Sequence, residues 1–444
     1  MRYLYFVIGF FLVASQVFIA IINRYPPTIE QLLFVNLLTK TITTSWILLW
    51  TLRLLTLVTM ILSLRIYFLL LCKLTKNRDV AYVSSLIILA SPLFFSTWYL
   101  YPTYAVFSLL ALVILFFVAN KKGLIMVCIL SIFFNLVIKQ SHPKFFEAFN
   151  ASVMTSQVTD RFQNEDSITE KIAIPLWFKR LSYNKYYFSY KTIINEVLQF
   201  PDLETWFFDE VHPLSQKSMV MFYWPELLLA VYGGAVILRN NQFLAKKLGM
   251  YLLVGFVFFV FSNDLQASYR QYLSWWFLSV VIGVGIVSIS SYAFMKYIYS
   301  LVMAILFLSV LFNYYDLVKR QDFWFDNRPI AYGYLFPTIK TVNYKSTVYM
   351  TSLIGHAAEY CKFYYGVCPA YYNFDGFNIS KKPLARNGIY AGFIGEFAGT
   401  RMENNFNDSD IKMIISNVKV VGIYKLRDSI AYLYGENIVV GVKK

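Results

Sequence analysis

The stretch Arg24-Tyr-Pro-Pro-Thr-Ile-Glu30-Gln31 directly follows the first long hydrophobic run of the chain. Its two prolines end the preceding helix, because proline lacks the N–H that a helix interior needs. The stretch therefore places one acidic side chain, Glu30, at the surface of a membrane. A short amphipathic segment, residues 32–40, comes after it. We expect any chemistry of this chain to take place here, at the outer face of a bundle of membrane helices.

Composition places the chain among polytopic α-helical membrane proteins. Hydrophobic residues make up 58% of the 444 residues and charged residues only 15%, whereas a soluble domain carries about 25% charged residues. Hydrophobic runs of bilayer-spanning length recur along the chain. The net charge of +15 comes from lysines and arginines spread between these runs. This pattern favours membrane topology and contacts with membrane lipids over nucleic acid as its cause.

Run length predicts about nine transmembrane helices. They cover residues 3–22, 54–72, 80–97, 104–119, 123–138, 219–238, 248–262, 273–290 and 297–313. Basic residues fall on one side of these spans, which the positive-inside rule assigns to the cytoplasm. They are Arg2, Lys73, Lys76, Arg78, Lys121, Lys122, Arg239, Lys246, Lys247 and Lys296. An odd number of spans places the carboxyl terminus outside, and we expect the first span to be retained rather than cleaved.

Two domains are predicted from this topology. Residues 1–313 form the transmembrane domain, with a first outer loop at 23–53 and a long outer loop at 139–218. In the first loop, residues 29–38 and 42–52 are expected to form helices along the membrane interface. Residues 314–444 form an extracytoplasmic soluble domain of α/β or α+β type. Its helical stretch is 356–365, and its strand-like runs are 346–353, 389–397, 418–426 and 438–442.

The four cysteines and the motifs exclude several kinds of chemistry. Cys361 and Cys368 lie in the soluble domain, where they either form a disulfide or remain two buried thiols, and both readings stay open. Cys72 and Cys128 lie in spans and are expected to pack. The sequence has no Cys/His spacing typical of zinc, no Walker loop and no dinucleotide fingerprint. No cofactor is therefore predicted, with a divalent metal left open.

Glu30 and Arg53 are the first candidate site residues, and each has a structural and a functional interpretation. Glu30 is either a surface carboxylate near the lipid headgroups or a general base whose pKa is raised by burial. Arg53 opens the second span at the same face. It either anchors the helix in the interface or holds an anionic phosphate.

A second group of candidates lies between the seventh and eighth spans. An arginine flanked by tyrosines, where a helix re-enters the membrane, suits a lipid-linked phosphate. The same pattern is also typical of an aromatic belt with a snorkelling arginine. This group consists of Asp264, Tyr269, Arg270 and Tyr272. His212, followed by Pro213 near the sixth span, is a further candidate with the same ambiguity.

The order of these motifs resembles the GT-C superfamily of membrane glycosyltransferases, in the branch that contains protein mannosyltransferases. Tyr25–Glu30 resembles the first outer loop of that family, Leu52-Arg53-Leu54 the start of its second helix, and Ala90–Phe95 the end of its third span. Segments 183–185, 206–208, 212–213 and 223–229 follow the order of its long outer loop and re-entry helix. Ser268–Tyr272 stands where the family carries an arginine thought to contact the lipid phosphate, and 363–369 resembles an aromatic element of its outer domain.

The resemblance implies an inverting transfer of a sugar from a polyprenyl-phosphate carrier to a glycan, protein or lipid acceptor outside the cytoplasmic membrane. Glu30 would be the base, Arg270 and Arg53 would hold the carrier phosphate, and His212 would line the cavity. Two positions depart from the family pattern: Ile29 replaces the first acid of an Asp-Glu pair, and residues 98–103 lack a second acid. An inactive scaffold or carbohydrate-binding protein therefore remains an alternative, as does a polysaccharide polymerase, ligase or transporter.

Overall fold

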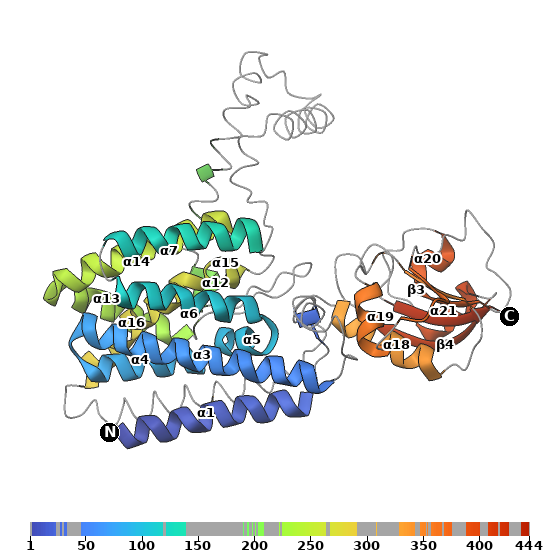
Figure 1. Ribbon diagram of the computed structural model, residues 1–444, viewed down its shortest axis with the longest axis horizontal. Coiled ribbons are helices and arrows are strands. Elements are labelled where there is room, and N and C mark those ends of the chain that lie inside the picture. Colours follow the sequence, from blue (N-terminus) through green and yellow to red (C-terminus); the bar gives the residue numbers. More distant parts are fainter. Residues whose placement is uncertain are drawn as a thin grey trace, which may run out of the picture.

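The computed structural model consists of a helical bundle and a smaller domain built on a β-sheet, which lies beyond one end of the bundle (Figure 1). The two chain ends lie at opposite ends of the molecule. The structure describes residues 2–23, 27–28, 31–32, 46–118, 121–138, 190, 193–194, 198, 200, 203–207, 222, 224–262, 267–290, 308, 328–341, 347–351, 353, 357–365, 368–374, 388–399, 407–415, 418–425 and 437–443.

The helices of the bundle follow the hydrophobic runs of the sequence. They are α1 (Arg2–Asn23), α3 (Trp46–Thr75), α4 (Arg78–Ala90), α5 (Pro92–Leu100), α6 (Pro102–Phe117), α7 (Lys121–Phe133) with the π-helical turn η1 (Phe134–Ile138), α13 (Trp224–Asn240), α14 (Gln242–Phe261) and α16 (Tyr272–Ser290). Two short helices, α12 (Leu203–Phe207) and α15 (Ala267–Arg270), contact each other beside them.

Four of these helices are long and apolar enough to cross a membrane, or up to five if the bent pair α4–α5 counts as one span. This agrees with a helical membrane protein. The nine spans predicted from the sequence are not shown by the described residues. Helices α1 and α6 contain shorter apolar stretches, Tyr5–Phe18 and Pro102–Phe117. The ninth predicted span, 297–313, lies outside the described residues except for Leu308.

Helix α3 is longer than the second span that the sequence predicts. Its 30 residues give a length of about 45 Å, whereas a bilayer core is about 30 Å thick. The prediction of a separate interfacial helix at 42–52 is wrong for Trp46–Leu52, which belong to α3, since neither proline nor glycine interrupts this apolar run. The first turns of α3 therefore reach the sheet domain, where Leu49 is buried.

Helices α4 and α5 meet at a bend of 71°, located at Ser91 and Pro92. Pro92 lacks an N–H, and the Ser91 side chain caps the first turn of α5 instead. The carbonyl of Leu89 thereby loses its helical donor, and Gln16 of α1 donates to it at 2.8 Å. Gln16 also accepts a hydrogen bond from the Trp98 indole at 3.0 Å. One buried side chain thus joins α1 to both α4 and α5.

Helix α16 is the central helix of the bundle, since 78% of the apolar stretch Tyr272–Ile289 is buried. Glycines let neighbouring helices approach it closely, as is common in membrane bundles. A Cβ added to Gly285 would lie 2.2 Å from the carbonyl oxygen of Leu229 in α13. In return, a Cβ added to Gly233 of α13 would lie 2.0 Å from the carbonyl oxygen of Val281. The backbones of α13 and α16 are therefore in direct contact at this crossing.

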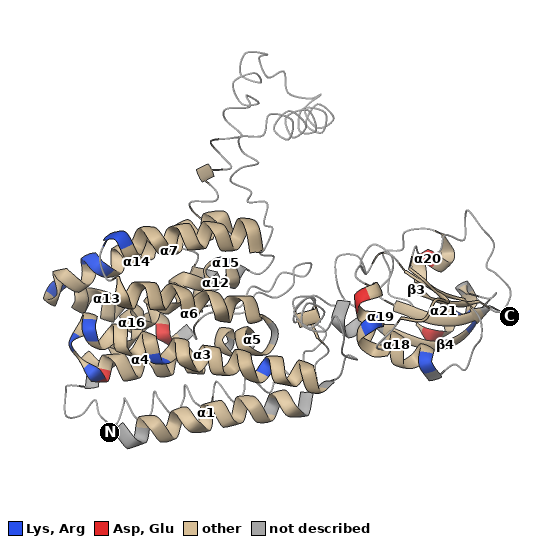
Figure 2. Ribbon diagram, viewed as in Figure 1, with Lys and Arg blue, Asp and Glu red and all other residues tan. Residues whose placement is uncertain are grey.

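Most charged side chains of the bundle gather at the end that faces away from the sheet domain (Figure 2). The basic ones stand where consecutive helices are joined by short connections. They include Lys73 at the end of α3, Arg78 at the start of α4, Lys121 at the start of α7 and Arg239 at the end of α13. The charge asymmetry expected from the sequence is thus present in the described connections.

The sheet contains five strands in the order β2-β1-β3-β5-β4. Strand β1 runs parallel to β2 and β3, and β5 runs antiparallel to β3 and β4. The strands are β1 (Val348–Met350), β2 (Tyr372–Asn373), β3 (Ile389–Phe393), β4 (Val418–Lys425) and β5 (Asn437–Lys443). Strands β1, β3, β4 and β5 confirm the four predicted runs, although the end of the second run forms helix α20 (Ile394–Ala398) instead.

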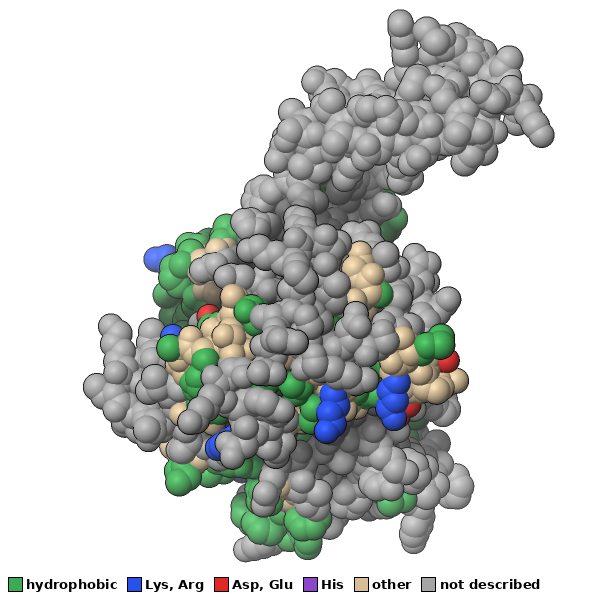
Figure 3. Space-filling model, turned by 90° about the vertical axis from the view of Figure 1, so that its right-hand side faces the viewer, with side chains coloured by type: hydrophobic (Ala, Val, Ile, Leu, Met, Phe, Trp, Pro, Cys, Tyr) green, Lys and Arg blue, Asp and Glu red, His purple; other side chains and the backbone are tan. Residues whose placement is uncertain are grey.

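Helices cover both faces of this sheet, which makes the domain a three-layer α/β arrangement. The alternation in β3 directs Ile389, Ala391 and Phe393 toward α18 (Arg328–Thr341) and α19 (Ala357–Tyr365), the latter in the predicted helical stretch. Tyr390 packs instead with α20 and α21 (Asp408–Ile414). Basic and acidic side chains stand at the surface of this end of the molecule (Figure 3). The predicted domain boundary at 313 lies outside the described residues.

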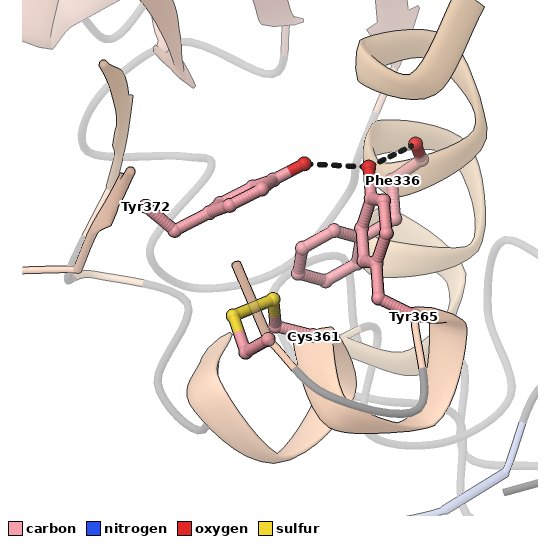
Figure 4. The surroundings of a disulfide bond; sticks show 5 residues. Phe336, Cys361, Tyr365 and Tyr372 are labelled. Atoms are coloured by element: carbon pink, nitrogen blue, oxygen red, sulfur yellow. Dashed lines mark hydrogen bonds between the residues drawn. A yellow bond between two sulfur atoms is a disulfide. The ribbon is translucent and has the colours of Figure 1, made fainter. Parts of the chain in front are cut away.

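Cys361 and Cys368 form a disulfide, which decides between the two readings that the sequence left open. The bond ties α19 to the segment that leads into β2. Beside it, the Tyr365 hydroxyl bonds to the Tyr372 hydroxyl and donates to the Phe336 carbonyl (Figure 4). Helix α19 is thus fixed both by the disulfide and by an aromatic hydrogen-bond network.

Glu396 of α20 carries a largely buried carboxyl group in the sheet domain. Its two oxygens accept hydrogen bonds from the Thr351 hydroxyl and the Phe393 N–H, each at 2.8 Å. Burial raises the pKa of this carboxyl from 4.5 to about 7, and the two hydrogen bonds offset part of that rise. Because its pKa is higher in the folded than in the unfolded chain, the stability that Glu396 contributes is present below pH 4.5 and is lost as pH rises to about 7.

We expect Glu396→Gln to remove this pH dependence. The amide resembles the protonated carboxyl, since its oxygen can accept from the Phe393 N–H while its nitrogen donates to Thr351. At pH 8 the variant should be more stable than the wild type by up to about 3 kcal/mol, and at pH 4.5 the two should be nearly equal. Thermal unfolding in detergent at both pH values measures the difference, and an equal gain at both would contradict the expectation.

Candidate functional site

Arg53 lies near the start of α3 and its side chain is fully buried. The guanidinium carbon lies 4.2 Å from the centre of the Tyr99 ring and 5.5 Å from that of Trp50. Its Nη2 donates to the side-chain oxygen of Gln31 at 3.3 Å. Such cation–π contacts stabilise a guanidinium that has left water. Burial argues against a simple interfacial anchor, and a contact between this guanidinium and a phosphate stays a prediction.

Gln31 connects the first outer loop to Arg53. The Gln31 side-chain oxygen accepts from the Thr28 N–H at 3.2 Å, and the Thr28 hydroxyl oxygen accepts from the Gln31 N–H at 3.4 Å. This reciprocal pair is a capping box, which begins a helical turn at Thr28. The Gln31 side-chain nitrogen donates to the carbonyl of Tyr99 at 2.6 Å. The turn is therefore fixed to α3 and α5 by one buried amide.

Tyr99 of α5 is the common partner of these elements. Its ring packs against the Arg53 guanidinium, its carbonyl accepts from Gln31, and its hydroxyl donates to the Ala20 carbonyl of α1 at 3.3 Å. The bend at Pro92 positions it, because α5 turns away from the direction of α4. Tyr99 thus contacts α1, α3 and the turn that carries Gln31.

Tyr269 and Tyr272 form a second cluster, against α6. The Tyr269 ring lies 4.8 Å from that of Tyr101 and 4.7 Å from that of Tyr104. The hydroxyl of Tyr272 bonds to Ser108 at 2.6 Å. Both tyrosines are buried inside the bundle. Their burial favours packing inside the bundle over an aromatic belt, in which the ring would stay at the lipid headgroups.

Arg270 is half-buried at the end of α15. Its Nε donates to the carbonyl of Ser262 at 3.2 Å, and its guanidinium carbon lies 4.2 Å from the Phe259 ring centre. Both partners belong to the end of α14. These contacts hold the guanidinium against the hairpin between α14 and α16 and fix its orientation.

The two arginines are connected through the corner between α5 and α6. Tyr99 contacts Arg53, and Tyr101, two residues later, contacts Tyr269, which precedes Arg270 in the chain. Pro102 begins α6 directly after this corner. The described contacts thus place both arginine-bearing segments against one aromatic corner. Their convergence on a single cavity stays a prediction.

Glu30, His212 and Asp264 lie outside the described residues. Glu30 is the direct neighbour in sequence of Gln31, and the structure describes the residues on both sides of the Ile29–Glu30 pair. The roles predicted for these three side chains stay predictions. In the described ranges no group of three or more His, Cys, Asp or Glu side chains could hold a metal ion.

The candidate residues predicted from the sequence do not include Gln31, Tyr99 or Glu226. The spacing of Thr28 and Gln31 matches a capping box and could have identified the turn. Tyr99 carries no comparable signal, because its role depends on contacts between distant segments. Glu226 lies in the first turn of α13 and is only 3% exposed. An acid buried in a membrane bundle is costly and is a candidate functional residue on that ground.

No family model, curated protein or solved structure matches the chain.

Proposed function

We propose that this protein is a membrane glycosyltransferase of GT-C type. It takes a sugar from a polyprenyl-phosphate carrier and attaches it to an acceptor on the extracytoplasmic side of the cytoplasmic membrane. The observation that carries the proposal is the buried Arg53, bound to Gln31, which adjoins Glu30 in sequence. A fixed cation beside a loop that supplies a carboxylate meets the two main demands of this reaction.

Two features support the sidedness of the proposal. The positive-inside rule assigns the basic end of the bundle to the cytoplasm, so the Arg53 end and the sheet domain face the exterior. The Cys361–Cys368 disulfide fits this assignment, since disulfides persist in oxidising compartments outside the cytosol.

The reaction needs a base, a donor and a stabilised leaving group. Glu30 accepts the proton of an acceptor hydroxyl, whose oxygen attacks the anomeric carbon of the sugar. The bond from that carbon to the phosphate oxygen breaks, and polyprenyl phosphate leaves with the electron pair. Arg53 and Arg270 stabilise the negative charge that grows on this phosphate. A single displacement inverts the anomeric centre. No nucleotide is required.

The second candidate is a scaffold or carbohydrate-binding protein with the same architecture and no catalysis. Trp98 and Tyr99 begin the segment in which related enzymes carry a second acid, and here both are buried. The Trp98 indole donates to Gln16 and the Tyr99 hydroxyl to the Ala20 carbonyl, so both serve the packing of α1. Turnover with any lipid-linked sugar would exclude this candidate.

Glu30→Gln is the direct test of the proposed chemistry. The amide keeps the size of the side chain but cannot accept the acceptor's proton, so transfer should fall about 100-fold or more. The rate of sugar transfer in nanodiscs supplied with a polyprenyl-phospho-sugar measures the effect. Asp79→Asn is the matched control, since Asp79 is exposed at the basic end of the bundle. Full activity of Glu30→Gln would remove Glu30 from the mechanism.

A further inference from the structure

The turn that carries Gln31 is held between the bundle and the sheet domain. Gln31 faces the bundle, where it bonds to Arg53 and Tyr99. The next residue, Leu32, is buried in the core of the sheet domain together with Leu49 of α3. In Figure 1 this short blue segment lies between α5 and α19. Two consecutive residues of this turn therefore contact two different parts of the molecule.

Tyr360 of α19 makes a polar contact at this interface. Its hydroxyl donates to the carbonyl of Pro27 at 3.0 Å, and its side chain is fully buried. Its ring stacks on that of Tyr332 of α18 at 4.7 Å. Pro27 precedes Thr28, the capping residue of the turn. The hydrogen bond thus fixes the point at which the chain enters the turn, while Leu32 fixes its other side.

The position of Tyr360 is fixed because several contacts hold α19 in place. Cys361, next to Tyr360, is fully buried and bonded to Cys368. One turn further on, the Tyr365 hydroxyl donates to the Phe336 carbonyl of α18 (Figure 4). A stack, a disulfide and a hydrogen bond therefore determine where the Tyr360 hydroxyl lies.

We infer that Tyr360 is a positioning residue, through which the sheet domain sets the turn that carries Gln31 against Arg53. The path runs from the Tyr360 hydroxyl to Pro27, through the capping box to Gln31, and from Gln31 to the guanidinium. The functional part of this inference rests on the proposed glycosyl transfer. Its structural part, the dependence of the turn on Tyr360, does not require any activity.

Tyr360→Phe removes the hydroxyl and keeps the ring that stacks on Tyr332. The hydrogen exchange of the Gln31 and Leu32 amides, measured by mass spectrometry on the full chain in nanodiscs, should become about fivefold faster or more, the factor for losing one buried hydrogen bond. Tyr365→Phe is the matched control on the same helix. Its hydroxyl bonds to Phe336 and Tyr372, which both belong to the sheet domain, so exchange of the turn should stay unchanged.

The transfer assay then separates positioning from folding. Tyr360→Phe should lower kcat about tenfold at nearly unchanged KM for the lipid-linked donor, while both variants should show the wild-type unfolding midpoint within a few degrees. Unchanged exchange of the turn in Tyr360→Phe would overturn the inference whatever the activity. Faster exchange together with unchanged kcat would overturn its functional part. If exchange is faster in Tyr360→Phe but the wild-type protein shows no sugar transfer, the positioning contact is supported and the proposed function is rejected.

Discussion

Gly285→Ala is expected to destabilise the bundle by about 3 kcal/mol or more, since overpacking a tight contact costs this much when nothing nearby can move away. The added methyl would lie 2.2 Å from the Leu229 carbonyl oxygen and 3.1 Å from its carbon. These are backbone atoms in the middle of α13, so relief requires the two helices to separate. The glycines at 255 and 283 differ, because serine hydroxyls face them and can rotate away.

Gly249→Ala is the control for this experiment. Gly249 lies within α14, and nothing stands within 4 Å of the position of its missing Cβ. Alanine should be neutral or stabilise the helix by up to about 1 kcal/mol. The thermal unfolding midpoint and the monodisperse fraction in detergent compare the two variants. Equal midpoints would show that the α13–α16 crossing is looser than the structure describes.

Arg53→Met is expected to lower kcat/KM for sugar transfer about 100-fold or more, the usual cost of removing one group that stabilises transition-state charge. Methionine preserves much of the length and the packing over the Tyr99 ring but removes the positive charge. Gln31 keeps its bonds to Thr28 and Tyr99, so the turn should remain in place. A loss of turnover without a loss of folded protein would thus point to the charge itself.

Arg65→Met provides the comparison on the same helix. Arg65 also lies over an aromatic ring, that of Phe68 at 5.7 Å, but its side chain is exposed. Its replacement should change transfer by less than about twofold, as expected for a surface cation. If both variants retained transfer within twofold of the wild type, Arg53 would have a packing role only.

The fold was predictable where it depends on local pattern. Hydrophobic length located the helices of the bundle, and the alternation of apolar residues located β1, β3, β4 and β5. The extension of α3 was missed because Arg53 seemed to mark the membrane surface, whereas burial over Tyr99 keeps it inside the protein. Pro92 is a local signal for the bend after Leu89, but the hydrogen-bond donor to the Leu89 carbonyl, Gln16, lies 73 residues earlier.

The candidate site was predictable only in its charged members. Arg53 and Arg270 were visible as basic residues at the ends of hydrophobic runs. Their partners were not, because the contact between Tyr360 and Pro27 joins residues 333 positions apart. Local sequence carries no signal for such pairs. The capping box at Thr28 and Gln31 is the exception, since its spacing is local.

The hydrogen bonds from Gln16 to α4 and α5 have a consequence for how the protein is made. Helix α1 leaves the ribosome long before α4 and α5, yet its amide is the partner of the Leu89 carbonyl and the Trp98 indole. These hydrogen bonds can form only after α4 and α5 have also been inserted. Removal of α1 would leave the Leu89 carbonyl and the Trp98 indole without these two hydrogen bonds.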